Sequence, residues 1–251
     1  MKVVLVGYGR MGREVELVLR ERGHEVTCRV DPSGSGDAPR LTPSLLSGAD
    51  MAIEFSHASS VVANCGIYVE AGVPAVVGTT GWTDRIEDVR RMVGGKIGYL
   101  WGSNFSIGAH LFFALAVYAT KLANAFPEYD VLAYELHHRR KKDSPSGTAL
   151  TLAQKVLEAS TRKRRVVTER LSRAPEPDEL HVASVRGGEV PGTHTFMLDS
   201  EADTVEITHR ARNRKGFAVG AVRAAEWLLG RKGFFTVETF IDDIFGEVAN
   251  V

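Results

Sequence analysis

Short β-branched runs alternate with amphipathic stretches along the first part of the chain. The runs that we predict as strands cover residues 2–6, 25–30, 51–55, 73–77 and 97–100. The segments between them could hold helices, and a glycine suited to a left-handed C-cap follows each of the predicted helices 10–22 and 58–71. Residues 32–43 are rich in Gly, Ser and Pro and predict a loop. This alternation indicates an α/β fold whose first domain is a parallel, doubly wound sheet of the Rossmann type.

The pattern changes beyond about residue 104. Residues 107–126 predict a helix that is apolar on nearly every side and should be buried between layers or subunits. A basic loop then separates a strand near 131–136 from a helix at about 148–160, and a last helix covers 217–229. Further strands are predicted at 180–185, 193–199 and 204–208. Short turns join these strands, which predicts a second α+β domain with a mostly antiparallel or mixed sheet.

The amino-acid composition mainly excludes certain classes of protein. The 251 residues carry 31 Lys+Arg and 31 Asp+Glu, and 44% of them are hydrophobic, which is typical of a soluble globular protein without nucleic-acid affinity. No apolar run approaches the roughly 18 residues that a membrane-spanning helix needs, and no secretory signal is recognisable. The two cysteines, Cys28 and Cys65, are too far apart for a C-x-x-C motif and should be reduced and buried. We therefore expect a cytoplasmic protein.

The segment Gly7-Tyr8-Gly9-Arg10-Met11-Gly12 matches G-x-G-x-x-G between a predicted strand and a predicted helix. In such a loop Gly7 allows the tight turn, Gly9 lets the backbone approach a pyrophosphate, and Gly12 permits close packing of the helix. The N–H groups at the start of the helix can then bind phosphate. A glycine-rich turn without a ligand is the alternative interpretation.

Asp31 stands at the end of the second predicted strand. Its carboxylate can accept hydrogen bonds from the ribose hydroxyls of a dinucleotide and would repel a 2′-phosphate, which favours NADH. Arg29 and Arg40 lie close enough in sequence to reduce that repulsion, so use of NADPH stays open. Asp31 could also be a solvated turn residue before Pro32.

Two other turns follow predicted strands at their carboxyl ends, the edge where open α/β sheets bind ligands. The candidate residues are Gly78, Thr79 and Thr80 after the fourth strand, and Gly102, Ser103, Asn104 and Phe105 after the fifth. Plain turns are an equally good interpretation of both segments.

Segment 135–148 holds the densest group of chemically active side chains. Two histidines at a strand end precede four consecutive cations and the start of a helix. Histidine exchanges a proton near neutral pH, lysine can hold a carboxylate or deliver a proton, and the helix start can bind an anion. The candidates are His137, His138, Lys141, Ser144 or Ser146 as the helix cap, Gly147 and Thr148. A solvated charge run beside a helix cap is the alternative.

Other sequence patterns give less information about function. Residues 162–165 are basic and predict a solvated helix end, and no spacing of histidines and cysteines indicates a metal site. Neither a P-loop nor a G-x-S-x-G motif occurs, which disfavours nucleotide hydrolysis and acyl transfer.

The run Glu135-x-His137-His138-x-x-Lys141-x-Asp143-x-Pro145-Ser146-Gly147-Thr148-Ala149 resembles the signature of the 4-hydroxy-tetrahydrodipicolinate reductases, also called dihydrodipicolinate reductases, of bacterial lysine and diaminopimelate synthesis. The likeness extends over essentially the whole chain, with further matching blocks at 7–13, 77–82, 104–108, 186–188 and 217–221. The resemblance implies reduction of a cyclic imino dicarboxylate with NADH, NADPH or both as cofactor.

The same resemblance assigns roles to residues. It makes His137 a proton donor or acceptor and Lys141 a proton donor. Substrate binding would fall on His138, Lys141, Ser146, Gly147 and Thr148, and nucleotide contacts on residues 7–12, Asp31, 78–80 and 102–105. It also implies a dinucleotide-binding domain formed by residues 1–104 and 218–251, and a substrate-binding domain at 105–217 whose sheet assembles a homotetramer.

Two alternatives from other classes remain. A noncatalytic NAD(H)-sensing module would explain the Rossmann half, but not the paired histidines, the lysine and the helix start in one loop. Another two-domain dehydrogenase, acting on a sugar or an amino-acid semialdehyde, is not excluded by fold. Semialdehyde enzymes of the glyceraldehyde type need a nucleophilic cysteine, and neither Cys28 nor Cys65 lies in the second domain.

Overall fold

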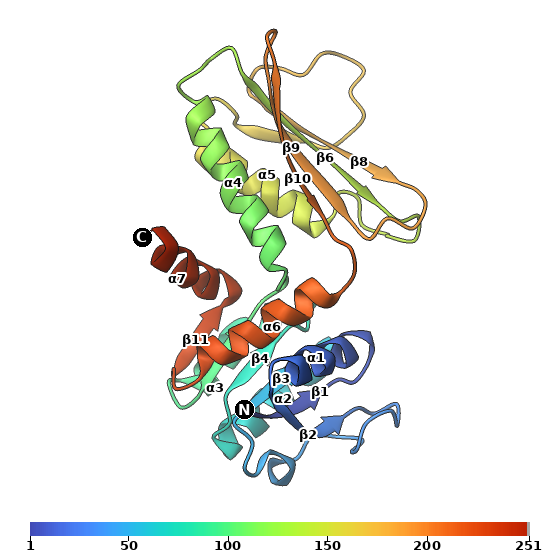
Figure 1. Ribbon diagram of the computed structural model, residues 1–251, viewed down its shortest axis with the longest axis vertical. Coiled ribbons are helices and arrows are strands. Elements are labelled where there is room, and N and C mark those ends of the chain that lie inside the picture. The colour runs from blue at the N-terminus through green and yellow to red at the C-terminus, as the bar shows by residue number, and fades with distance from the viewer. Residues whose placement is uncertain (250–251) are drawn as a thin grey trace. The chain divides into compact units, whose positions relative to one another are not determined.

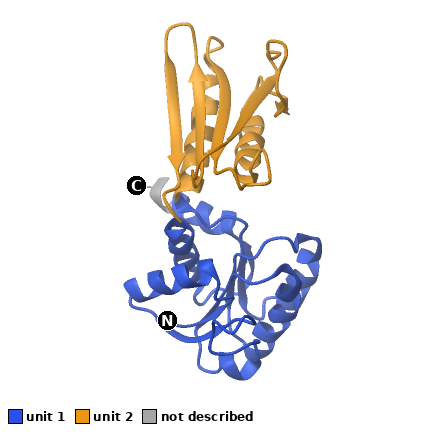
Figure 2. Ribbon diagram, turned by 90° about the vertical axis from the view of Figure 1, so that its right-hand side faces the viewer, with its two compact units in different colours: residues 1–107, 214–251 blue, residues 108–213 orange. Residues whose placement is uncertain are grey.

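The computed structural model describes residues 1–249 and divides the chain into two compact units, shown in Figure 2. The first unit contains residues 1–107 and returns at Arg214, and the second unit is Gly108–Asn213. No helix among the described residues is long and apolar enough to cross a membrane.

The sheet of the first unit is fully parallel, as predicted, and it has six strands (Figure 1). The strand order is β11-β5-β4-β3-β1-β2. The strands are β1 (Lys2–Val6), β2 (Glu25–Val30), β3 (Met51–Glu54), β4 (Ala75–Val77), β5 (Gly98–Trp101) and β11 (Gly233–Thr236). The helices are α1 (Arg10–Glu21), α2 (Ala58–Ala71), α3 (Ile86–Val93), α6 (Lys215–Leu228) and α7 (Val237–Ala249).

Both faces of this sheet are covered by helices, which explains why its inner strands β1, β3, β4 and β5 are apolar at nearly every position. In β1, Val3 and Leu5 belong to a core shared with α1, α6 and α7. Val4 and Val6 belong to a second core shared with α2 and α3, which also contains the buried, unpaired cysteines Cys28 and Cys65. A strand buried on both faces needs a continuous hydrophobic run rather than an alternating one.

The chain order reverses beside β1, because β2 lies on one side of it and β3 on the other. Open α/β sheets bind ligands outside the carboxyl ends of the strands at such a switch point. The loop that follows β1 is the glycine-rich loop, so topology and motif indicate the same place.

Two features of the first unit differ from the sequence prediction. Between β2 and β3 the structure has no α-helix, only a short 3-10 helix (Pro43–Leu46), because the preceding Gly, Ser and Pro residues favour turns. The edge strand β11 was not predicted, since its four residues show no alternation and become a strand only by pairing with β5.

The second unit contains a five-stranded mixed sheet in the order β10-β9-β6-β8-β7. Its strands are β6 (Asp130–His137), β7 (Arg165–Val167), β8 (Glu179–Arg186), β9 (Thr193–Asp199) and β10 (Thr204–Arg210). Helices α4 (Ile107–Ala123) and α5 (Gly147–Ala159) pack on one face of it, as Figure 1 shows. The short turn after β8 does not form a hairpin, because β6 lies between β8 and β9 and pairs with β8 in parallel.

The basic cluster at residues 162–165 is not the end of a helix, and that prediction was wrong. Helix α5 already ends at Ala159, and Lys163 is 3% exposed and pairs with Asp130 at 2.6 Å. The Arg162 guanidinium donates to backbone carbonyls at and just beyond the end of α4, including that of Ala123 at 3.1 Å. Helix ends leave carbonyls unsatisfied, so this cluster acts as a cap for α4.

Helix α4 is buried on one side only. Its inner face packs on the sheet through small and aromatic residues such as Phe112, Phe113 and Ala116. Its outer face exposes four large apolar side chains, Leu111, Leu115, Tyr118 and Leu122, by 48 to 64%. The prediction that the helix is apolar on nearly every side holds, but in the single chain the outer stripe faces solvent.

Candidate functional site

The glycine-rich loop has the geometry that a dinucleotide loop requires. Gly7 has a φ angle of +91°, and a Cβ atom there would lie 2.1 Å from the carbonyl oxygen of Phe55. A Cβ on Gly12 would lie 2.2 Å from the carbonyl oxygen of Gly7. Gly9 borders open space, and no side chain caps the start of α1. The first N–H groups of α1 therefore stand beside room for a pyrophosphate.

Asp31 follows β2 and is tied to this loop. Its Oδ2 accepts the N–H of Tyr8 at 2.7 Å, and its Oδ1 accepts the N–H and the hydroxyl of Ser33 at 2.8 and 2.5 Å. The bonds from Ser33 and Tyr8 keep the pKa of Asp31 below its usual value, so the carboxylate is charged. A carboxylate offers about four acceptor positions, so one remains for a ribose hydroxyl without any rearrangement of Ser33.

The other predicted nucleotide residues lie on the same edge of the sheet, and some have structural contacts. Thr79 is 5% exposed, and its hydroxyl accepts the N–H of Ser56 at 2.8 Å. Its carbonyl accepts the indole N–H groups of Trp82 and Trp101 at 2.7 and 3.1 Å. The Phe105 side chain is buried in the core. Whether these residues and Gly78, Thr80, Gly102, Ser103 and Asn104 touch a nucleotide stays a prediction.

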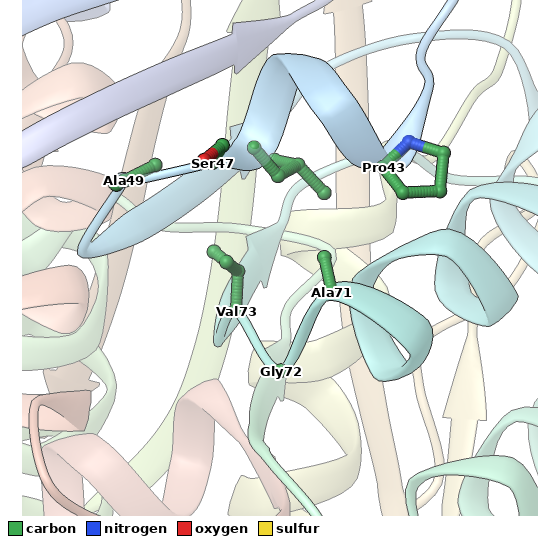
Figure 3. A pocket seen from close by; sticks show the side chains of 8 residues that line it. Pro43, Ser47, Ala49, Ala71, Gly72 and Val73 are labelled. Carbon is green, nitrogen blue, oxygen red and sulfur yellow. The ribbon is translucent and has the colours of Figure 1, made fainter.

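A pocket of about 410 Å³ in the first unit is not at this edge (Figure 3). Its lining comes from residues 43–49 and 71–73, which precede β3 and β4 and therefore lie at the amino ends of these strands. None of the lining residues is ionisable. The pocket lacks the chemistry of a phosphate or acid/base site.

In the second unit, strand alternation brings a buried acid and a histidine together. Every second residue of β6 from Val131 faces the helices, which places Glu135 and His137 on the buried face. Glu135 is 0% exposed and His137 is 7% exposed. The Nδ1 atom of His137 lies 2.9 Å from Oε2 of Glu135, outside ideal hydrogen-bond geometry.

The strand register supplies Glu135 with its other partners. Ser184 on β8 and His194 on β9 are the cross-strand neighbours of Glu135. Its Oε1 accepts from the Ser184 hydroxyl at 2.9 Å, from Nη2 of Arg186 at 2.8 Å and from the N–H of Ser146 at 2.8 Å. Burial alone would raise the pKa of Glu135, but hydrogen bonds from His194, Ser146 and Arg186 hold it well below its usual value. Glu135 is therefore a buried, charged carboxylate.

His137 is neutral near pH 7 in this environment. Burial lowers its pKa to about 4, against the opposing effect of the Glu135 charge. The carboxylate beside Nδ1 favours a proton on that nitrogen, which leaves Nε2 as the proton acceptor. Gly192, with a φ angle of +153°, makes room there, since a Cβ would lie 2.9 Å from Nε2.

The cationic loop and the start of α5 lie close to this pair. The Lys141 charge is near enough to lower the pKa of His137, and its Nζ pairs with Oδ1 of Asp143 at 2.9 Å. The backbone N–H of His138 donates to the carbonyl of Val190 at 2.8 Å. The Nδ1 atom of His138 is buried without a hydrogen-bond partner among the described residues.

Ser146 is the N-cap of α5 rather than a free binding group. Its hydroxyl accepts the N–H of Ala149 at 3.2 Å, its own N–H donates to Glu135, and it is 2% exposed. Gly147, by contrast, is exposed and Thr148 is partly exposed. The helix start therefore presents the backbone N–H groups of Gly147 and Thr148, while direct contact of Ser146 with a ligand stays a prediction.

Sequence reasoning missed the residues that support His137. The spacing i, i+2 on an alternating strand could have placed Glu135 beside it. Ser184, Arg186 and His194 come from β8 and β9, and only the pairing register shows that they surround the carboxylate. The pairing register of these strands cannot be predicted from any local sequence pattern.

Glu135, His137 and His194 also have the atom types of a metal site, all within 4.8 Å of one another. Arg186 already neutralises Glu135 and would repel a cation from the same carboxylate. We therefore interpret the group as a proton network, and the expectation that the protein needs no metal stays a prediction.

Two family models together match most of the chain. The model described as dihydrodipicolinate reductase, N-terminus, matches residues 1–105. The model described as dihydrodipicolinate reductase, C-terminus, matches residues 108–241. The N-terminal model lies within the first unit, and the C-terminal model covers the second unit together with residues 214–241, which belong to the first unit.

Individual relatives agree with the family models. The chain is 36% identical to the 4-hydroxy-tetrahydrodipicolinate reductase of Christiangramia forsetii over 247 residues, covering 98% of this chain and 99% of the relative. It is 40% identical to that of Archaeoglobus fulgidus over 201 residues, with 77% and 76% covered. A solved structure, dipicolinate-bound dihydrodipicolinate reductase from Paenisporosarcina sp. TG-14, has the same fold, with a TM-score of 0.74, 23% identity and coverage of 94% and 97%.

The lowered pKa of His137 predicts a loss of stability in mild acid. As pH falls, the unfolded chain takes up this proton near pH 6.5 and the folded chain only near pH 4, so folding weakens across that window. The contribution is about 3 kcal/mol at most. Thermal unfolding from pH 7.5 to 4 should show a smaller fall in Tm for His137→Gln than for the unchanged chain or for the control His181→Gln. Parallel curves for all three proteins would contradict this.

Proposed function

The chain belongs to the dihydrodipicolinate reductase family, and from that premise we propose which of its residues carry the reaction. It is an oxidoreductase that reduces 4-hydroxy-tetrahydrodipicolinate to tetrahydrodipicolinate in lysine and diaminopimelate biosynthesis. Its cofactor is a nicotinamide dinucleotide, which supplies a hydride when bound. The observation that supports our assignment most strongly is that His137, Glu135 and the cationic loop meet beside the start of α5.

We assign proton delivery to His137 and Lys141. Reduction of a conjugated imine leaves an enamine-like carbon that must take up a proton, so a positioned acid is required. Lys141 can donate a proton. Neutral His137 can take up a second proton on Nε2 and pass it on. A bound substrate with two negative carboxylates would raise the pKa of His137 and favour its protonated form.

Glu135 and Arg186 position His137 rather than react. The carboxylate fixes the proton on Nδ1 and the ring orientation, and Arg186 keeps the buried carboxylate charged. Without Arg186 and the serines, burial would favour a protonated Glu135 that no longer orients the imidazole.

We assign the substrate carboxylates to the N–H groups of Gly147 and Thr148, to Lys141 and to His138. A helix start attracts carboxylates through its free N–H groups, and Lys141 adds a charge if it leaves Asp143. Ser146 contributes by holding this helix start against Glu135. The dipicolinate in the Paenisporosarcina protein is a dicarboxylate, which supports this class of substrate.

We place the dinucleotide on the glycine loop from Gly7 to Gly12 and on Asp31, with further contacts at 78–80 and 102–105. The uncapped start of α1 and the open space at Gly9 support the phosphate position. The charged carboxylate of Asp31 supports NADH, because a 2′-phosphate would meet like charge there.

We also propose a cytoplasmic homotetramer assembled through the second unit. The exposed apolar stripe of α4 supports self-association, since exposed apolar surface of this kind marks an interaction site. The number four and the use of the sheet rest on the family resemblance.

Removing the acid/base groups should separate their roles. His137→Gln should lower kcat by about 10²-fold or more with little change in NADH affinity, since general acid catalysis is worth 10²–10⁴-fold. Lys141→Ala should lower kcat and raise the substrate KM, because a charge is lost together with a proton source. Steady-state kinetics and fluorescence titration of NADH measure both. If the variants kept kcat and lost NADH affinity, the loop would belong to the nucleotide site.

Coenzyme preference follows from Asp31. NADH should be used at least as well as NADPH, measured as kcat/KM for each dinucleotide at saturating substrate. A preference for NADPH above about tenfold, roughly 1.4 kcal/mol, would show that nearby cations outweigh Asp31.

Light scattering at micromolar concentration tests the assembly. The molar mass of the particle should be a multiple of the 27.4 kDa of one chain, with about four copies expected. Changing two stripe residues, Leu115 and Tyr118, to Ser should weaken the assembly if α4 takes part in it. A species of about 27 kDa from the unchanged chain would refute the proposal.

A further inference from the structure

Arg29 is the cation nearest in sequence to Asp31, and the structure shows it paired with two acids. It stands on β2, two residues before Asp31. Its Nε donates to Oε2 of Glu16 at 2.9 Å, and its Nη2 donates to Oε1 of the same residue at 2.5 Å. Its Nη1 donates to Oδ2 of Asp37 at 3.0 Å. Three of the five N–H donors of this guanidinium are thus used.

Glu16 is an unusual residue for the middle of a Rossmann helix. It lies in α1 and is 4% exposed, although helices packed on a sheet normally bury apolar side chains. Besides Arg29 it accepts the Tyr8 hydroxyl and Nη2 of Arg20. Hydrogen bonds from Arg29 and Tyr8 lower its pKa to about 2, so it stays charged throughout the physiological range.

The same cluster reaches the nucleotide loop. Tyr8 is the second residue of the glycine motif, and its backbone N–H donates to Asp31 while its hydroxyl donates to Glu16. The Arg29 guanidinium lies 5.7 Å from the centre of the Tyr8 ring. Asp31, Tyr8, Glu16 and Arg29 therefore form one connected group at the place assigned to the adenosine ribose.

We propose that Glu16 is a specificity-determining residue, which disfavours NADPH by holding the Arg29 guanidinium in an ion pair on α1. The inference rests on the proposed dinucleotide site. An arginine beside the ribose acid is what accommodates a 2′-phosphate in NADPH-binding Rossmann sites. Here that arginine faces Glu16 and Asp37, so an incoming phosphate meets three carboxylates, including Asp31, and a cation that is already paired.

Removing the charge of Glu16 takes away one strong ion pair of Arg29 and leaves a side chain of similar size in place. Glu16→Gln keeps the volume of the buried group and can still accept a hydrogen bond, but it no longer neutralises the guanidinium. Arg29 then keeps only Asp37 as a charged partner, so its Nε and Nη2 donors can form a bidentate pair with a phosphate, for which guanidinium geometry is well suited.

The matched control is Glu14→Gln. Glu14 lies on the same helix and carries the same charge, but it makes no ion pair within residues 1–249. Its substitution reproduces the change in net charge near the loop while leaving Arg29 held. The double variant Glu16→Gln/Arg29→Gln removes the residue through which the effect is proposed to act.

The experiment is direct binding of NADH and of NADPH, followed by the fluorescence of the reduced nicotinamide without substrate. Glu16→Gln should raise the affinity for NADPH relative to NADH by about tenfold or more. Glu14→Gln should leave the ratio unchanged, and the double variant should lose the gain. An unchanged ratio in Glu16→Gln, or a gain that persists in the double variant, overturns the proposal.

Retained NADH binding shows that the Glu16→Gln protein is folded. If that variant does not fold, Asp37→Asn removes the exposed second partner of Arg29 and should shift the ratio in the same direction by a smaller factor. No shift in Asp37→Asn would then overturn the proposal. If the unchanged chain binds neither dinucleotide, the proposed cofactor site fails; if it binds them and the variants keep its ratio, only the role of Glu16 fails.

Discussion

A fully buried carboxylate, Glu135, is the constraint on which the chemistry of the second unit depends. A charge without water needs partners on every side, and losing one of them costs several kcal/mol. Its oxygens contact Ser146 at the start of α5, Ser184 and Arg186 on β8, and the rings of His137 and His194. Satisfying one carboxylate therefore fixes the helix start, the neighbouring strands and the His137 ring together.

This arrangement explains why the basic loop differs from an ordinary solvated charge run. The cations of residues 139–142 would be a solvated run if β6 did not end in a buried, oriented imidazole. Burial makes that imidazole neutral and the carboxylate sets its tautomer, so a proton can enter and leave at Nε2. The first unit uses the same physics, since buried Glu16 fixes Arg29 and Tyr8 beside the glycine loop.

Sequence patterns correctly predicted the features that depend on interactions between residues close together in the chain. The apolar runs, the glycine loop and the acid after β2 lie where the sequence placed them, because each depends on burial or backbone geometry within a few residues. The motif 135–149 likewise brought His137, Lys141 and the helix start together. The pairing of β6 with both β8 and β9 was not predictable, because short turns favour hairpins and both partner strands lie more than 40 residues along the chain from their paired residues in β6. The prediction for residues 162–165 failed for the same reason, since Arg162 bonds to the carbonyl of Ala123 at the end of α4, a distant segment of the chain.

Nitrogen-15 NMR of the histidine rings tests the central claim, that burial keeps His137 neutral beside a charged Glu135 and ready for a dicarboxylate. At pH 7 the free protein should show a neutral His137 with its proton on Nδ1. Saturating dipicolinate should move the His137 titration to higher pH, because two negative charges approach the ring. A His137 that is protonated at pH 7 without ligand, or whose titration the dicarboxylate does not move, would contradict the account.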